Sequence, residues 1–224
     1  EIGSGLVGSE MCIRDRFCEG YTEYNYLDYF KRYIDNNLRA KYSDIVIEPM
    51  NAKGNAMQVY NYAEDFLKKE ENASKYIYYE KHLVFDCDAP ENIQQVITLM
   101  KDSGNDYILD YSNLLFETWL VMHFQNLEPE KDNSKRTIIK LMRDYLKVTK
   151  YTNKIKASKG TIGKILGSNG NEKIRAAIEN AKLLEKHWED KGKDMDRDIT
   201  QMNPAVDIYK LIERLLDEIV YLCG

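Results

Sequence analysis

The sequence predicts a mixed α/β fold: a mostly parallel sheet flanked by helices, with a helical extension at the C-terminal end. Short apolar segments alternate with longer amphipathic ones over the first half of the chain. This is the pattern of βαβ units and a parallel sheet. Beyond about residue 128 only helical periods remain. The composition, 43% hydrophobic and 31% charged over 224 residues, is that of one ordinary globular unit.

Five elements can be placed in order before residue 101. Residues 22–38 place apolar side chains at the 3.6-residue period, which predicts a helix. Residues 44–50 (DIVIEPM) are short, β-branched and closed by proline, as in a buried strand. Residues 54–69 predict a second amphipathic helix. Residues 82–90 (HLVFDCDAP) predict an apolar strand that ends abruptly in two acids, and residues 92–100 predict a third helix.

A further strand and helix follow directly. Residues 106–111 (DYILDY) predict a strand. Residues 112–124 (SNLLFETWLVMHF) predict a helix whose N-terminus is capped by Ser112 or Asn113, since both side chains can accept a hydrogen bond from a backbone N–H group.

The extension is predicted to be helical throughout. Helices are expected over residues 134–146, 172–188 and 203–222. In the last of these, Asn203 can cap the helix and Pro204 can occupy its first turn. We expect these helices to pack on the sheet layer.

The segment 1–16 (EIGSGLVGSEMCIRDR) fits neither period and runs abruptly into FCEGYTE. It resembles a translated sequencing adapter and is interpreted as a non-native leader, with a flexible native leader as the alternative. The natural strand before Phe17 would then be missing, or imitated by residues 12–17. The remaining chain divides into an α/β core, 17–127, and the helical extension, 128–224.

Charge and cysteine content exclude several classes of protein. A net charge of −5 and an isoelectric point near 5.4 leave no attraction for nucleic acid over the whole surface, so any such contact must be local. The 4 cysteines form no CxxC pair, which argues against a zinc site or a disulfide framework. No apolar run reaches the roughly 18 residues of a membrane span, and no secretion signal is recognisable. A cytoplasmic location without membrane contact is expected.

Acidic residues follow two of the predicted strands. Glu19, followed by Gly20, ends the first strand, and Asp86 and Asp88 end the strand of residues 82–90. Parallel strands bring their carboxyl ends to one edge of the sheet. Three carboxylates there repel one another unless a divalent cation offsets their charge, and oxygen ligands suit Mg²⁺ or Mn²⁺. Phosphoryl transfer uses such a site. An Asp-x-Asp taken alone fits a solvated turn better than a metal site.

Three motifs in order resemble those of RloB-like proteins. FCEGYTEYNYLDYF resembles an opening EGxTE motif, VFDCD a second acidic motif, and SNLLFETWLVMHF the signature SNPxFExWLxxHF. NPAVDIYKLIERL near the C-terminus also resembles a family motif, so the likeness runs from Phe17 to Leu216. Two departures are Leu114, where the family pattern carries proline, and the missing first strand. We expect Leu114 to alter the local turn and not the chemistry.

The resemblance implies a TOPRIM fold, the metal-binding module shared with topoisomerases and primases, and a Mg²⁺- or Mn²⁺-dependent nuclease of bacterial anti-phage defence. Glu19 then matches a general base or metal ligand, and Asp86 and Asp88 match the metal-binding pair. Glu117 is expected to be an accessory site residue. His123 is interpreted as a hydrogen-bonded packing residue.

Glu23 stays open between a first-turn acid favoured by the helix dipole and a site residue. Residues 145–170 carry 6 lysines and no acid. This strip is interpreted as a flexible segment that holds a nucleic-acid backbone through Lys154, Lys156 and Lys159, or as a solvated loop. The resemblance also implies a separate ATPase as a partner.

Two other functions stay open. LVFDCD and YILDYS also resemble the nucleophile and Ser/Thr motifs of haloacid dehalogenase-like phosphatases, although that class usually places its nucleophile strand near the start of the chain. A non-catalytic interaction or regulatory subunit of a defence system is the other alternative. Dependence of the activity on Glu19 separates the nuclease from the phosphatase.

Overall fold

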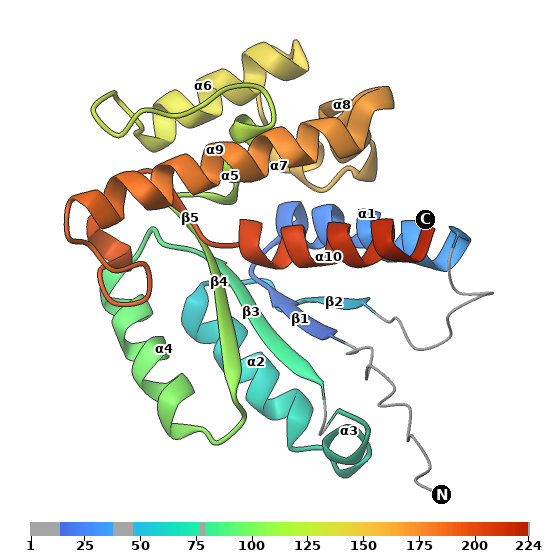
Figure 1. Ribbon diagram of the computed structural model, residues 1–224. Coiled ribbons are helices and arrows are strands. Elements are labelled where there is room, and N and C mark those ends of the chain that lie inside the picture. Colours follow the sequence, from blue (N-terminus) through green and yellow to red (C-terminus); the bar gives the residue numbers. More distant parts are fainter. Residues whose placement is uncertain (1–13, 38–46, 77–78, 224) are drawn as a thin grey trace, which may run out of the picture.

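A computed structural model of the chain describes residues 14–37, 47–76 and 79–223. Its centre is a five-stranded sheet in the order β2-β1-β3-β4-β5, in which the first four strands are parallel and β5 is antiparallel to β4 (Figure 1). The strands are β1 (Arg14–Cys18), β2 (Ile47–Asn51), β3 (Glu80–Asp86), β4 (Tyr107–Asn113) and β5 (Ala205–Val206). The predicted mixed α/β class with a mostly parallel sheet is confirmed.

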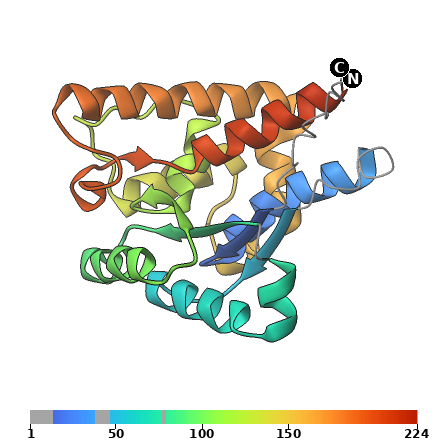
Figure 2. The ribbon, with the colours of Figure 1, turned by 60° about the horizontal axis from the view of Figure 1, so that its bottom comes forward.

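Helices cover both faces of this sheet. They are α1 (Tyr21–Asn37), α2 (Ala56–Leu67), α3 (Glu70–Lys75), α4 (Pro90–Asp102), α5 (Phe116–Met122), α6 (Lys135–Leu146), α7 (Asn153–Lys156), α8 (Lys159–Leu166), α9 (Gly170–Asp190) and α10 (Tyr209–Cys223). Helices α2 and α4 pack on one face, while α1, α9 and α10 lie on the other (Figures 1 and 2). Most of the predicted helices are present, but residues 38 and 44–46 of two predicted elements lie outside the described residues.

Successive side chains of β1 and β3 enter two separate apolar cores. Phe17 and Leu83 pack with α2 and α4, whereas Cys18 and Val84 pack with the helices of the opposite face. This alternation follows from the two-residue period of a strand. Because both faces are covered, Leu83, Val84 and Phe85 form a continuous buried apolar run in β3.

The inner strand β1, between β2 and β3, begins inside the segment interpreted as a leader. Residues 14–16 pair with β2 on one side and β3 on the other, and Arg16 is fully buried. The sheet therefore has its first strand, formed by RDRFC, in line with the alternative that this segment takes the place of the natural strand.

The predicted caps of the helix after β4 are wrong. Ser112 and Asn113 belong to β4, and Leu115 is the residue that precedes the first turn of α5. The peptide bond between Asn113 and Leu114 is cis. The side chain of Asn113 instead donates to the backbone oxygens of Ile199 and Met202, at 2.9 and 2.6 Å.

The start of the last helix was also predicted wrongly. Asn203 and Pro204 are joined by a cis peptide bond and lead into β5, and α10 begins only at Tyr209. The helical extension thus contributes a strand to the edge of the sheet. Two residues are too few to show a two-residue period in the sequence.

The lysine-rich strip is mostly helical, so its interpretation as a loop is wrong. It forms α7 and α8, and the buried side chains of Ile162 and Ile165 hold α8 in the core. Within the described parts of the chain, no helix has the length and apolar character needed to cross a membrane.

Candidate active site

The carboxyl ends of β1 and β3 bring two predicted site residues together. Glu19 follows β1, and its backbone N–H donates to the oxygen of Val84 at 3.0 Å, which extends the pairing of the two strands. Its side-chain Oε2 accepts a hydrogen bond from the backbone N–H of Asp86, also at 3.0 Å. The side chain of Glu19 is therefore held at the end of β3.

Two helices bring further carboxylates to the carboxyl ends of β1 and β3. Glu23 lies in the first turn of α1 and Glu117 in the first turn of α5, where the helix dipole favours a negative charge. Both are almost fully buried, with 4% and 1% of their surface exposed. Together with Glu19 and Asp86 they line a pocket of about 480 Å³. Its remaining lining residues are Gly20, Tyr21, Thr22, Gly54, Asn153 and Lys156.

Burial and mutual repulsion alter the acidity of these groups. Burial raises the pKa of Glu19 to about 7 and that of Glu23 to about 8. Burial and the neighbouring carboxylates of Glu23, Glu117 and Glu19 raise the pKa of Asp86 well above its ordinary value. In the absence of a cation the pocket thus retains protons near neutral pH.

The pocket offers oxygen atoms suited to a hard cation. Oε2 of Glu23 and Oδ1 of Asp86 are buried without a hydrogen-bond partner. Oε1 of Glu117 lies 2.8 Å from the ammonium nitrogen of Lys156. Among the described residues, no three His, Cys, Asp or Glu side chains are already placed to hold one ion jointly. The donors fit Mg²⁺ or Mn²⁺ by their chemistry.

Asp88 does not line this pocket. Its Oδ2 lies 2.6 Å from the ammonium group of Lys135 on α6, and both side chains are partly exposed. Burial is the main cause of the raised pKa of Glu19. The hydrogen bond from Asp86 lowers this pKa, and the negative charge of Asp88 raises it. Of the three predicted metal ligands, the structure brings Glu19 and Asp86 together, whereas Asp88 faces Lys135.

The lysines predicted to contact nucleic acid have separate surroundings. Lys154 is exposed on α7. Lys159 is exposed at the start of α8 and forms an ion pair of 2.9 Å with Asp28. Lys156 turns inward and lines the acidic pocket.

His123 lies in the core behind the site. Tyr26 donates its hydroxyl hydrogen to Nε2 at 2.9 Å, and Nδ1 donates to the backbone oxygen of Trp119 at 3.0 Å. This pairing assigns the neutral tautomer with the proton on Nδ1. Burial lowers the pKa of His123 to about 4, so the ring is neutral at pH 7. His123 is a packing residue in this structure.

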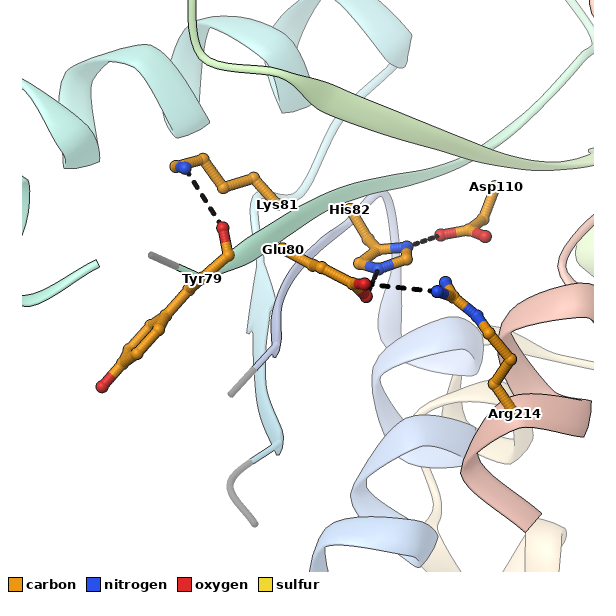
Figure 3. Close-up of polar contacts among 6 residues, drawn as sticks. All are labelled: Tyr79, Glu80, Lys81, His82, Asp110 and Arg214. Atoms are coloured by element: carbon orange, nitrogen blue, oxygen red, sulfur yellow. Dashed lines mark hydrogen bonds and ion pairs between the residues drawn. The ribbon is translucent and has the colours of Figure 1, made fainter. Parts of the chain in front are cut away.

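A second polar cluster lies on the same face of β3 as Asp86. The fully buried ring of His82 sits between two carboxylates, with Nδ1 at 2.6 Å from Asp110 and Nε2 at 3.2 Å from Glu80 (Figure 3). Arg214 of α10 contacts the other oxygen of Glu80 at 3.2 Å. The cluster ties β3, β4 and α10 together.

Residues 17–215 match the family described as RloB-like protein. The chain belongs to the RloB-like family. The match covers most of the chain and includes every residue of the acidic pocket. No significant match was found among curated proteins or among solved structures.

The sequence of this RloB-like chain does not assign two charged residues of the pocket lining to the acidic site. Glu23 stays open between a helix first-turn acid and a site residue, although its spacing of four residues from Glu19 is a usable signal. Lys156 was assigned to the nucleic-acid strip, because nothing local to α7 shows that its side chain pairs with Glu117.

Proposed function

We propose that this RloB-like chain is a metal-dependent nuclease that cleaves phosphodiester bonds of DNA or RNA in bacterial anti-phage defence. The observation that carries the proposal is the convergence of Glu19, Glu23, Asp86 and Glu117 in one pocket at the carboxyl ends of parallel strands. Buried carboxylates this close are costly without a cation, and metal-assisted phosphoryl transfer is the chemistry that such sites support.

Mg²⁺ or Mn²⁺ is the proposed cofactor. Glu19, Glu23, Asp86 and Glu117 of the pocket lining would hold it, and Asp88 would join them if it gave up its contact with Lys135. When bound, the metal polarises a phosphate oxygen. Glu19, whose pKa burial raises to about 7, has the basicity to accept a proton from an attacking water near neutral pH.

The substrate is proposed to reach the pocket across α7 and α8. Asn153 and Lys156 of α7 line the pocket, and Lys154 and Lys159 are exposed next to them. The chain has a net charge of −5, so these lysines form a local positive region. They can attract a phosphate backbone whatever the base sequence of the nucleic acid. The resemblance to RloB-like motifs also implies a TOPRIM-type nuclease module, and we propose a separate ATPase as the partner that controls it.

The test is cleavage by the purified chain. Plasmid, single-stranded DNA and total RNA are incubated with Mg²⁺, with Mn²⁺ and with chelator. Cutting should require metal and fall at least 100-fold in Glu19→Gln and Asp86→Asn, while Glu179→Gln, on the exposed side of α9, should keep it. Thermal melting verifies that each variant folds. Cutting that persists in chelator, or in Glu19→Gln, would remove the proposal.

A phosphatase is the second candidate, because Ser112 is the β4 neighbour of Asp86 and its hydroxyl is buried without a hydrogen-bond partner. Phosphate release from p-nitrophenyl phosphate that depends on Asp86 and not on Glu19 would favour it. A chain that is inert in both assays and binds a partner protein tightly would favour a regulatory subunit.

A further inference from the structure

Lys156 is the cation that the acidic pocket already contains. Its ammonium nitrogen lies 2.8 Å from Oε1 of Glu117, and 31% of its side-chain surface is exposed. Glu117 itself is buried, so this contact places a positive charge beside an acid that has little access to water. The lysine therefore offsets part of the negative charge that would attract a metal ion.

The charge of Lys156 acts on the whole pocket. Burial lowers the pKa of its ammonium group, but the carboxylates of Glu117, Asp86 and Glu23 outweigh this effect and raise the pKa above the ordinary value. Lys156 consequently stays charged at neutral pH. A divalent cation bound to the same acids would be repelled at close range by this ammonium group.

The lysine is carried by a short element with few ties to the core. Helix α7 has only four residues, and none of them is fully buried. Asn25 of α1 donates to the backbone oxygen of Lys156 at 3.2 Å, and Thr161 donates to that of Ile155 at 2.7 Å. The side chain can thus leave Glu117 by changing rotamers, since part of its surface is already open to solvent.

We propose that Lys156 and a divalent cation compete for Glu117 and the carboxylates around it, so that the lysine keeps the pocket weakly binding for metal until it is withdrawn. The inference rests on the proposed metal-dependent function and adds a means by which this chain limits it. Metal binding and the contact between Lys156 and Glu117 are then mutually exclusive.

The experiment is calorimetric titration of the full chain with Mn²⁺ at pH 8. Lys156→Met removes the charge and keeps the aliphatic stem, and should lower the Kd for Mn²⁺ at least tenfold. Lys156→Arg keeps the charge and should stay within threefold of the unmodified chain. Lys159→Met is the matched control, because it removes an equal charge from α8 that pairs with Asp28 outside the pocket lining.

The outcomes separate this inference from the proposed function. Mn²⁺ binding that depends on Glu19 and Asp86 but does not tighten in Lys156→Met would overturn the competition and leave the function standing. Weaker binding in Lys156→Met would also overturn it, since this is the result of a purely structural lysine. If Mn²⁺ binding tightened equally in Lys159→Met, the effect would come from the net charge of the chain alone, and the competition would be refuted. An absence of binding in every variant would overturn both proposals. Lys156→Gln replaces Lys156→Met if the latter does not fold.

Discussion

A Cβ atom on Gly20 would lie 3.0 Å from Oε2 of Glu23, a contact so tight that the carboxylate would have to shift. That oxygen is buried and has no hydrogen-bond partner. The glycine after Glu19 therefore has a specific effect: it leaves space for a second carboxylate of the pocket.

Gly20→Ala should move the Glu23 carboxylate and leave the fold intact. The end of a flexible side chain can shift at little cost, so we expect the free energy of unfolding to change by less than about 1 kcal/mol. The Kd for Mn²⁺ should rise several-fold. Gly163→Ala is the control, because its Cβ meets nothing within 4 Å on α8 and alanine favours a helix. Unchanged metal affinity in Gly20→Ala would show that Glu23 does not assist binding.

The stability of the metal-free chain should decrease as the pH rises from about 5 to about 8. Burial raises the pKa of Glu19 to about 7 and that of Glu23 to about 8, whereas the unfolded chain loses these protons near pH 4.3. The folded state thus binds more protons in this window, and the free energy of unfolding falls by about 1.4 kcal/mol per pH unit for each group before it levels above the folded pKa values.

Urea denaturation in chelator at several pH values measures this slope. The double variant Glu19→Gln and Glu23→Gln should flatten it. Because Mg²⁺ binds the ionised carboxylates, its stabilising effect should grow over the same pH range. A metal-free chain whose stability rises between pH 5 and pH 8 would contradict the expectation.

Asp110→Asn should destabilise the chain by about 2 kcal/mol, because it weakens the hydrogen bond between a buried carboxylate and a fully buried ring. Asp110 is buried and contacts the fully buried His82 at 2.6 Å. Glu128→Gln is the comparison, since its ion pair with Lys131 is exposed and should contribute less than about 1 kcal/mol. Chemical denaturation measures both. Similar small changes in the two variants would mean that the cluster around His82 contributes little to stability.

Removing Lys154 and Lys159 should weaken nucleic-acid binding without regard to sequence. If each contacts one phosphate, the double alanine variant should reduce the slope of log affinity against log salt by about 2. Fluorescence anisotropy with labelled oligonucleotides in metal-free buffer measures this slope. Lys68→Ala is the control, because Lys68 is exposed next to α2 and the opposite face of the sheet. An unchanged slope in the double variant would place the substrate elsewhere.

Local patterns were sufficient to predict much of this protein. The 3.6-residue period identified the helices that became α1, α2, α4, α6 and α9. Acids at the ends of two strands were sufficient to predict that Glu19 and Asp86 meet, because parallel strands end at the same edge of a sheet. The motifs were sufficient to recognise the RloB-like family.

The remaining features depend on contacts between distant segments. Residues Ala205–Val206 become a strand only because β4 offers them an edge, and Asn113 faces the backbone of residues 199 and 202 instead of capping a helix. The pairing of Lys156 with Glu117, 39 positions apart in the chain, likewise gives no local sign. Sequence periodicity reports which face of an element is apolar, whereas the partner of a buried charge is decided by which elements the packed core brings side by side.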